Sequence, residues 1–320
     1  MSIPIVYVFD ENYAAYSCVS AISACRKATE DIVFHVITDH TDDKAEQIFV
    51  NELNAHGQTV KTYKANLGFD FVEGRISRSA YLKLSIPGLI EEKKILYVDG
   101  DTIFQDCPSK AFKVDLEDKV IGAVCDYSHF PRQRSQWESK IIPFKDKNET
   151  YMNSGMMIWN LERLENENLI VNCKKIEQDY PDKIRYNDQD LLNKVFEGKK
   201  KIVDYKFNHQ IWNGIISKSK WEEISDPDYK GVNLFHFIGK YKPWKKCCNP
   251  LIKNYWRTFA SQLKTIKIQM QPLENFRQKR HFARMLHLSE RYQEASKLRE
   301  ELIDIMDKRF KKVQKNNLDE

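Results

Sequence analysis

The sequence predicts an α/β fold with a mainly parallel central sheet and helices on both of its faces. In the first half of the chain, short apolar runs alternate with stretches of helical periodicity, as βαβ units require. Hydrophobic residues make up 42% of the 320 residues and aromatic residues 12%, enough to fill such a core. A carboxylate directly follows three of the apolar runs, at Asp10, Asp99 and Asp126. Ligands of parallel sheets bind beyond the carboxyl ends of the strands, so these side chains are the first site candidates.

The apolar runs predict strands at residues 3–9, 32–37, 60–63, 94–98, 120–125, 156–161 and 233–238. Helical spacing covers residues 13–27, a stretch that ends at residue 56, residues 79–90, and a helix that begins over 188–196. Asn12 is the expected N-cap of the first helix, because its side chain can accept a hydrogen bond from the first turn. The alternation is less regular in the second half of the chain.

A helical extension is expected at the end of the chain. Apolar residues recur every three or four positions from residue 285 to residue 313, which predicts one long amphipathic helix, after a shorter one over 274–286. Residues 265–320 hold 13 Lys and Arg against 9 Asp and Glu, so they carry +4 of the chain's net charge of +5. We therefore expect a nearly neutral main domain over residues 1–264 and a basic helical extension over residues 265–320.

Composition argues against several classes of protein. No apolar run approaches the roughly 18 residues of a membrane-spanning helix, and the first residues lack the basic start of a signal peptide. The seven cysteines are odd in number and include no CxxC pair, which favours reduced thiols in the cytoplasm over a disulfide framework. The neutral main domain disfavours nucleic acid as a partner.

Asp99 and Asp101 are the strongest candidates for metal ligands. They follow an apolar strand, which sends alternate side chains to one face and can aim both carboxylates at one ion. Carboxylate oxygens suit Mg²⁺ or Mn²⁺, which also bind phosphate oxygens. An Asp-x-Asp tripeptide alone is more often a solvated turn, and the strand in front of it is what favours the metal site.

A second candidate segment spans residues 235–244, with the sequence FHFIGKYKPW. A histidine inside an apolar run, such as His236, is usually a core residue, but with two carboxylates it would complete a mixed site that suits Mn²⁺. Gly239 allows a close approach of the backbone to a ligand. Lys242 offers a cation to a phosphate.

Five ordered motifs resemble family 8 glycosyltransferases of the GT-A fold, which include bacterial lipopolysaccharide galactosyl- and glucosyltransferases. They read FDENYAAY, ILYVDGDTI, YMNSGMMIWNL, YNDQDLLN and HFIGKYKPW, and the resemblance covers residues 3–260. It implies a single Rossmann-like catalytic domain over residues 1–264, a UDP-sugar donor, and Mn²⁺ or Mg²⁺ bound by Asp99, Asp101 and His236. The donor's nucleotide and diphosphate would contact Val8, Asp10, Asn12, Tyr13, Lys83, Asp99, Gly100, Gly239 and Lys242. Its sugar would contact the catalytic set, Asp126, Asn153, Asp188 and Gln189.

The resemblance also implies a retaining reaction. No Asp or Glu of the motifs matches a nucleophile, and Gln189 is a poor one, so attack from the front face of the sugar is the favoured hypothesis. The family pattern ISxxxYxRL reads ISRSAYLKL here, so Lys83 stands where the family has an arginine. Lysine keeps the positive charge but cannot bind a carboxylate or phosphate through two parallel N–H groups as a guanidinium can. Segments of the type FNxQ line the family's site, so His209, which follows Phe207 and Asn208, is a further candidate site residue.

Several alternatives stay open from the sequence. The donor hexose is galactose or glucose, and the acceptor is a lipopolysaccharide core, another surface glycan or a protein. A silent nucleotide-sugar binder and a nucleotidyltransferase are the competing classes; the latter would show a glycine-rich loop near the start, yet no glycine precedes Gly57. The extension favours homo-oligomerisation over peripheral contact with the cytoplasmic face of the inner membrane. Residues 127–137 form either an acceptor lid or a plain surface loop.

Overall fold

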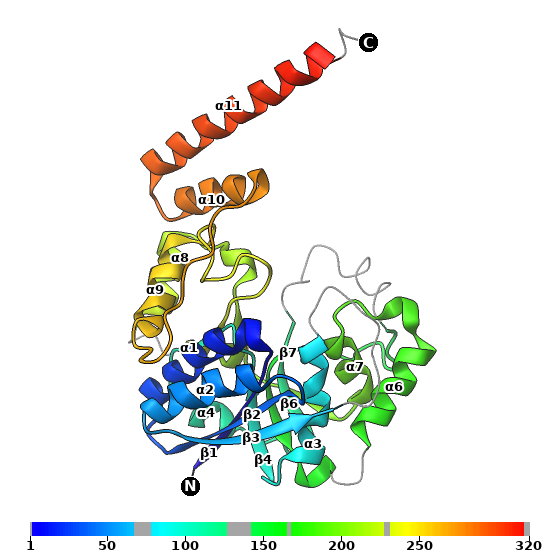
Figure 1. Ribbon diagram of the computed structural model, residues 1–320. Helices are drawn as coiled ribbons and strands as arrows, with labels where there is room; N and C mark the ends of the chain where they lie inside the picture. Colours follow the sequence, from blue (N-terminus) through cyan, green and yellow to red (C-terminus); the bar gives the residue numbers. More distant parts are fainter. Residues whose placement is uncertain (1, 67–77, 127–141, 165–167, 227–230, 317–320) are drawn as a thin grey trace. The chain divides into compact units, whose positions relative to one another are not determined.

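The computed structural model describes residues 2–66, 78–126, 142–164, 168–226 and 231–316, drawn in colour in Figure 1. The chain divides into two compact units. The first comprises residues 1–210, 230–236 and 262–267, and the second comprises residues 211–229, 237–261 and 268–320. The division into a catalytic domain over residues 1–264 and an extension over residues 265–320 stays a prediction about function.

The first unit is built on a seven-stranded sheet with the order β3-β2-β1-β4-β7-β6-β8. Four neighbouring pairs are parallel, and only β7 runs antiparallel to both of its neighbours. The predicted mainly parallel sheet is therefore confirmed. The strands are β1 (Ile3–Val8), β2 (Ile32–Asp39), β3 (Thr59–Ala65), β4 (Lys94–Val98), β6 (Ile121–Cys125), β7 (Met152–Asn160) and β8 (Lys200–Ile202).

Helices cover both faces of this sheet, as Figure 1 shows. One buried core joins the sheet to α1, α2 and α4, and a second core joins the opposite face to α3, α6 and α7. Alternate residues of β1 divide between the two cores, because successive side chains of a strand point to opposite faces. The helices are α1 (Glu11–Lys27), α2 (Asp43–Ala55), α3 (Ile86–Leu89), α4 (Ser109–Phe112), α6 (Leu169–Asp179) and α7 (Asp188–Val195).

The first helix begins two residues earlier than predicted, with Asp10 and not Asn12 as its N-cap. The Asp10 carboxylate accepts a hydrogen bond from the Tyr13 backbone N–H at 3.2 Å. Both residue types can cap a helix, and the choice follows from where β1 ends. Because the strand stops at Val8, the chain is already turning at Asp10, and Asn12 lies within the first turn.

The predicted helix over residues 79–90 is instead a 3₁₀ helix, Arg78–Ser85, followed by the short α3. The break has a local cause at Pro87, near the start of α3. Proline has no N–H to donate to the carbonyl four residues back, and its ring crowds that carbonyl, so a regular α-helix cannot pass through it.

The late strands differ most from prediction. β7 begins at Met152, four residues before the predicted start at 156. The prediction missed these residues because polar side chains and a glycine interrupt the apolar pattern there. The strand expected over residues 233–238 is the shorter β10 (Leu234–His236). It lies between β5 (Thr102–Phe104) and β9 (His209–Gln210) in a small separate sheet that the sequence did not predict.

The second unit contains α8 (Lys218–Ser225), α9 (Pro250–Ala260), α10 (Phe276–Leu288) and α11 (Tyr292–Asn316). The prediction of one helix over residues 285–313 is wrong, because the chain turns between α10 and α11. The Ser289 hydroxyl donates to the carbonyls of Met285 and Leu286, and Glu290 adopts a positive φ of 61°. Among the described residues, no helix combines the length and the apolar character needed to cross a bilayer.

Candidate functional site

Three carboxylates lie at one edge of the central sheet. Asp99 directly follows β4, Asp126 directly follows β6, and Asp10 lies two residues beyond β1. β1 and β4 are parallel, and β6 runs in the same direction because both it and β4 are antiparallel to β7. The three strands therefore end at the same edge, where the alternation of strands and helices predicted a site.

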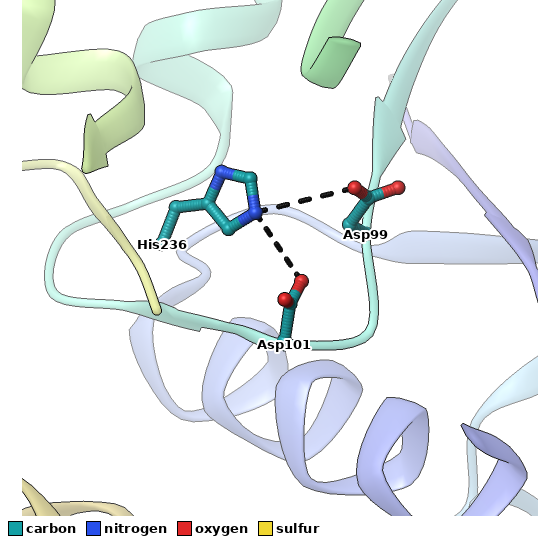
Figure 2. A group of neighbouring side chains, drawn as sticks. All are labelled: Asp99, Asp101 and His236. Carbon is teal, nitrogen blue, oxygen red and sulfur yellow. Dashed lines mark ion pairs between the residues drawn. The ribbon is translucent and has the colours of Figure 1, made fainter. Parts of the chain in front are cut away.

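The small sheet brings His236 to this edge from a distant part of the chain. β10 pairs antiparallel with β5, so that His236 lies opposite Thr102, the residue after Asp101. The His236 Nε2 atom lies 3.3 Å from Asp101 Oδ1 and 4.0 Å from Asp99 Oδ2. Figure 2 shows the three side chains converging, and one ligand atom of each lies within 4.8 Å of the others.

The surrounding hydrogen bonds determine which nitrogen of His236 carries a proton. The Gly155 backbone N–H can only donate, and it donates to Asn153 Oδ1 at 3.0 Å. The same oxygen lies 2.8 Å from Asn208 Nδ2, which must therefore donate to it. Asn208 Oδ1 is then the atom that faces His236 Nδ1, at 2.9 Å, and Nδ1 supplies the proton. The other ring nitrogen, Nε2, faces the two carboxylates.

A shared cation would satisfy this cluster. Asp99 and Asp101 repel one another unless positive charge lies between them, and either a bound cation or a proton on His236 Nε2 supplies that charge. His236 and Asp101 are buried, so water can do little to offset that repulsion. A mixed set of one nitrogen and two oxygens suits Mn²⁺, and Mg²⁺ less well. The predicted metal ligands thus fit the ion that the sequence suggested.

Gly155 makes room for the histidine ring. A Cβ atom added at this position would lie 2.1 Å from His236 Cε1, far inside contact distance. Gly100, between the two aspartates, is similarly close to α1, where an added Cβ would lie 2.2 Å from Ser17 Oγ. Both glycines therefore allow close packing at the site, and the Gly100 backbone lies against α1.

Lys83 connects Asp99 to a second buried carboxylate. Its Nζ atom lies 2.8 Å from Asp188 Oδ2 and 3.5 Å from Asp99 Oδ1, with its side chain 4% exposed. Burial alone would lower the pKa of this ammonium, but the charges of Asp188 and Asp99 outweigh burial and raise that pKa well above its usual value. Lys83 therefore stays charged, and a single ammonium serves both aspartates where the family's arginine would present a fork.

The other predicted catalytic residues form one hydrogen-bonded group beside the metal ligands. Asp126 Oδ2 accepts from Gln189 Nε2 at 2.9 Å and from Asn153 Nδ2 at 3.2 Å. Gln189 Oε1 accepts from the Ser154 backbone N–H at 3.0 Å, and the Ser154 hydroxyl donates to Asp188 at 3.0 Å. All four predicted residues are buried. The structure therefore brings together side chains from β7, α7 and the end of β6.

The residues predicted to hold the nucleotide at the end of the first strand are less buried than the predicted catalytic residues. Val8 and Asp10 are half-buried, Asn12 is exposed, and Tyr13 is half-buried on α1. Burial and the charges of Asp101 and Asp99 raise the pKa of Tyr13. Their role in nucleotide binding stays a prediction.

Gly239 and Lys242 belong to the second unit. Gly239 has a φ of 87°, and an added Cβ would lie 2.4 Å from Asn213 Oδ1, so the local backbone alone accounts for this glycine. The Lys242 Nζ atom donates to the Phe237 carbonyl at 2.9 Å. A contact of these two residues with a diphosphate stays a prediction, and the predicted lid over residues 127–137 lies outside the described residues.

Three residues with clear roles at the site were not singled out as site residues from the sequence. Tyr97 donates to Asp99, Ser154 bridges Gln189 and Asp188, and Asn208 orients His236. His209, which the FNxQ segment favoured, instead stacks edge-on against Phe235. The alternation of a strand could have suggested Tyr97, because it points to the same face as Asp99 two residues later.

Comparison with known proteins identifies the family. The model of glycosyl transferase family 8 matches residues 4–248. The chain belongs to this family. This family 8 member is 24% identical over 253 residues to a putative glycosyltransferase of Haemophilus influenzae, covering 77% of this chain and 74% of that protein. It is 23% identical to lipopolysaccharide 1,2-glucosyltransferase of Escherichia coli, covering 78% of this chain and 75% of that enzyme.

A solved structure supports the same assignment. The galactosyltransferase LgtC, in complex with donor and acceptor sugar analogues, superposes with a TM-score of 0.69 at 25% identity, covering 83% of this chain and 98% of LgtC. Some relatives are much longer, and the match spans 42% of GlyB of Streptococcus pneumoniae. The GT-A type of α/β fold expected from the motifs is thus confirmed.

Proposed function

We propose that this family 8 member is a retaining, metal-dependent hexosyltransferase that moves galactose or glucose from a UDP-sugar to a glycan acceptor. The observation that carries the proposal is the convergence of two carboxylates and the Nε2 atom of His236 at the sheet edge. Asp99, Asp101 and His236 would hold Mn²⁺. When bound, that ion would supply positive charge to offset the charge that builds on the departing diphosphate.

The donor sugar would be held by the buried group beside the metal ligands. Asp126, Asn153, Asp188 and Gln189 offer carboxylate acceptors and amide donors, which suit sugar hydroxyls. Each already has protein partners, so the group is held in place before a ligand arrives. Such prior ordering reduces the entropy lost on binding.

The favoured reaction course is attack by the acceptor hydroxyl on the front face of the donor sugar. The leaving phosphate would take the acceptor's proton as the bond to the sugar carbon breaks. Gln189 is an amide whose two polar atoms are engaged by Ser154 and Asp126, so it is poorly suited to act as a nucleophile. Its role would be to orient the sugar.

A UDP-release assay over a panel of nucleotide sugars with Mn²⁺ tests this function, because slow donor hydrolysis reveals the donor before an acceptor is known. We expect release with a UDP-hexose, its loss on chelation of the metal, and its loss in Asp101→Asn. Asp118→Asn, which changes a side chain that is 76% exposed, is the matched control and should keep activity. Absence of UDP release across the panel, with intact binding of UDP-sugar, would instead favour a silent binder.

Gln189→Ala tests the course of the reaction separately. If Gln189 only orients the donor, the variant should retain measurable transfer, reduced by about 100-fold, as for a misplaced substrate. Complete loss of transfer while UDP-sugar binding is intact would contradict front-face attack without a protein nucleophile. Binding is measured separately by calorimetry with the non-hydrolysed donor analogue.

The acceptor and location follow from the relatives by analogy. One relative is a lipopolysaccharide glucosyltransferase, so we propose a lipopolysaccharide core or another surface glycan as acceptor, with a protein acceptor as the alternative. A reaction on such an acceptor would take place in the cytoplasm, at the inner face of the membrane. The basic extension over residues 265–320 would then contribute oligomerisation or peripheral membrane contact.

A further inference from the structure

The two oxygens of Asp99 lie in different surroundings. Oδ2 faces His236 Nε2 across 4.0 Å. Oδ1 accepts a hydrogen bond from the Tyr97 hydroxyl at 2.5 Å and lies 3.5 Å from Lys83 Nζ. A carboxylate whose one oxygen is already engaged by a hydroxyl and an ammonium presents the other oxygen to a metal ion.

Tyr97 is well placed to hold this arrangement. It lies in the middle of the sheet on β4, two residues before Asp99, and is 1% exposed. Its ring packs against Lys83, whose Nζ atom lies 4.7 Å from the ring centre. The Tyr97 hydroxyl and the Lys83 ammonium therefore both approach Asp99 Oδ1, and together they oppose rotation of the carboxylate.

We propose that Tyr97 is a positioning residue of the metal site, which holds the Asp99 carboxylate so that its Oδ2 atom would face the ion. The inference rests on the proposed metal-dependent function. Outer partners of metal ligands hold a ligand in its binding orientation, and their loss typically weakens metal affinity by about 10- to 100-fold. Asp99 keeps the Lys83 contact without the hydroxyl, so we expect the lower part of that range.

Tyr97→Phe removes only the hydroxyl, and the chain offers a closely matched control. Tyr7 lies on the neighbouring strand β1, is 0% exposed, and its hydroxyl bonds to Ser20 Oγ at 2.9 Å. Within the described part of the chain it contacts no carboxylate of the site and reaches only the backbone carbonyl of Asp99, indirectly through Ser20 and Thr102. Tyr7→Phe therefore tests what the loss of a buried tyrosine hydroxyl does in the same sheet. Unfolding midpoints of both variants establish that each is folded at the assay temperature.

The measurement is the Mn²⁺ dissociation constant, from the electron paramagnetic resonance signal of free Mn²⁺, with and without UDP. We expect about tenfold weaker binding in Tyr97→Phe and a change below twofold in Tyr7→Phe. Wild-type affinity in Tyr97→Phe, or equal weakening in both variants, would overturn the positioning role. Asp101→Asn separates the two proposals, because Mn²⁺ binding that survives this change contradicts the proposed metal site itself.

Discussion

At the scale of single residues, the site depends on close packing and hydrogen bonds that hold the His236 ring in one orientation. Gly155 lets the His236 ring approach the strand, and Asn208 holds the ring by Nδ1 so that Nε2 faces the carboxylates. Neither effect adds a ligand, yet both decide whether the ligands converge. Small changes beside the ligands should therefore affect metal binding strongly.

Gly155→Ala is expected to weaken Mn²⁺ binding by at least about tenfold, because the new methyl group would displace His236. Gly122→Ala on β6 is the control. Its Cβ would meet Leu116 Cδ2 at 2.5 Å, the far end of a side chain that can move. The control should lose some stability and keep its Mn²⁺ affinity. Equal Mn²⁺ affinities in the wild type and both variants would show that Gly155 is not needed to place the His236 ring.

Lys83→Met is expected to destabilise the first unit by about 3 kcal/mol, because removing one member of a buried ion pair leaves an uncompensated charge. The charge left behind would be that of Asp188, whose side chain is 6% exposed. Lys94→Met is the control, since Lys94 donates to the Val114 carbonyl and has no carboxylate partner in an ion pair of the described chain. Chemical denaturation measures both; a loss in Lys83→Met no larger than in Lys94→Met would contradict the charge argument.

At the scale of elements, the pairing of β2 with β3 buries an ionisable side chain away from the site. His35 on β2 is 0% exposed, its Nδ1 lies 3.1 Å from the Tyr63 hydroxyl, and its Nε2 lies 3.8 Å from Glu92. Burial and the charge of Lys61 lower the pKa of His35 to about 4, although Glu92 acts in the opposite direction. The folded protein therefore holds this histidine neutral.

This predicts a stability that falls in mild acid. The unfolded chain takes up a proton on His35 near its ordinary pKa of about 6.5 and the folded chain only near 4, so the unfolded state binds more protons between these values. The contribution is complete above pH 6.5 and is lost as the pH falls towards 4, by up to about 3 kcal/mol. Denaturation between pH 7 and 4.5 should show a shallower decline in His35→Phe than in the wild type. A variant of the exposed His40, His40→Phe, should follow the wild type, and identical slopes in all three would contradict the assignment to His35.

At the scale of the whole molecule, α11 presents apolar side chains that the described chain leaves exposed. Ala295 and Leu302 are buried where α11 packs on α10, whereas Tyr292, Ile303 and Met306 are each more than half exposed. Residues 292 and 303 are three turns apart and share a face of the helix. This face is the natural place for the predicted self-association.

If α11 pairs with its copy, Ile303→Glu combined with Met306→Glu should reduce the mass measured by light scattering to that of one chain. Val171→Glu in the first unit, at the same 57% exposure, should leave the mass unchanged. A wild-type protein that is already a single chain would contradict oligomerisation.

Liposome flotation tests membrane contact separately, with a variant in which Gln replaces Arg277, Arg280 and Arg284, which are exposed on α10.

The sequence by itself determined the sheet and the family, and it predicted the metal ligands. Alternating apolar runs specify strands and helices locally, and Asp99 and Asp101 follow β4 directly, so their place at the sheet edge needs no distant contact. It misplaced the first N-cap, the helix over residues 79–90 and the long C-terminal helix, because capping and breaks depend on single residues such as Asp10, Pro87 and Ser289.

Only the tertiary structure decided how the ligands act together. The pairing of β10 with β5 brings His236 beside Asp101 across more than 130 residues of sequence. The proton on its Nδ1 follows from a chain of hydrogen bonds through Asn208 and Asn153 to the backbone of Gly155. Such roles arise from contacts between distant segments, and no local pattern of residues encodes them.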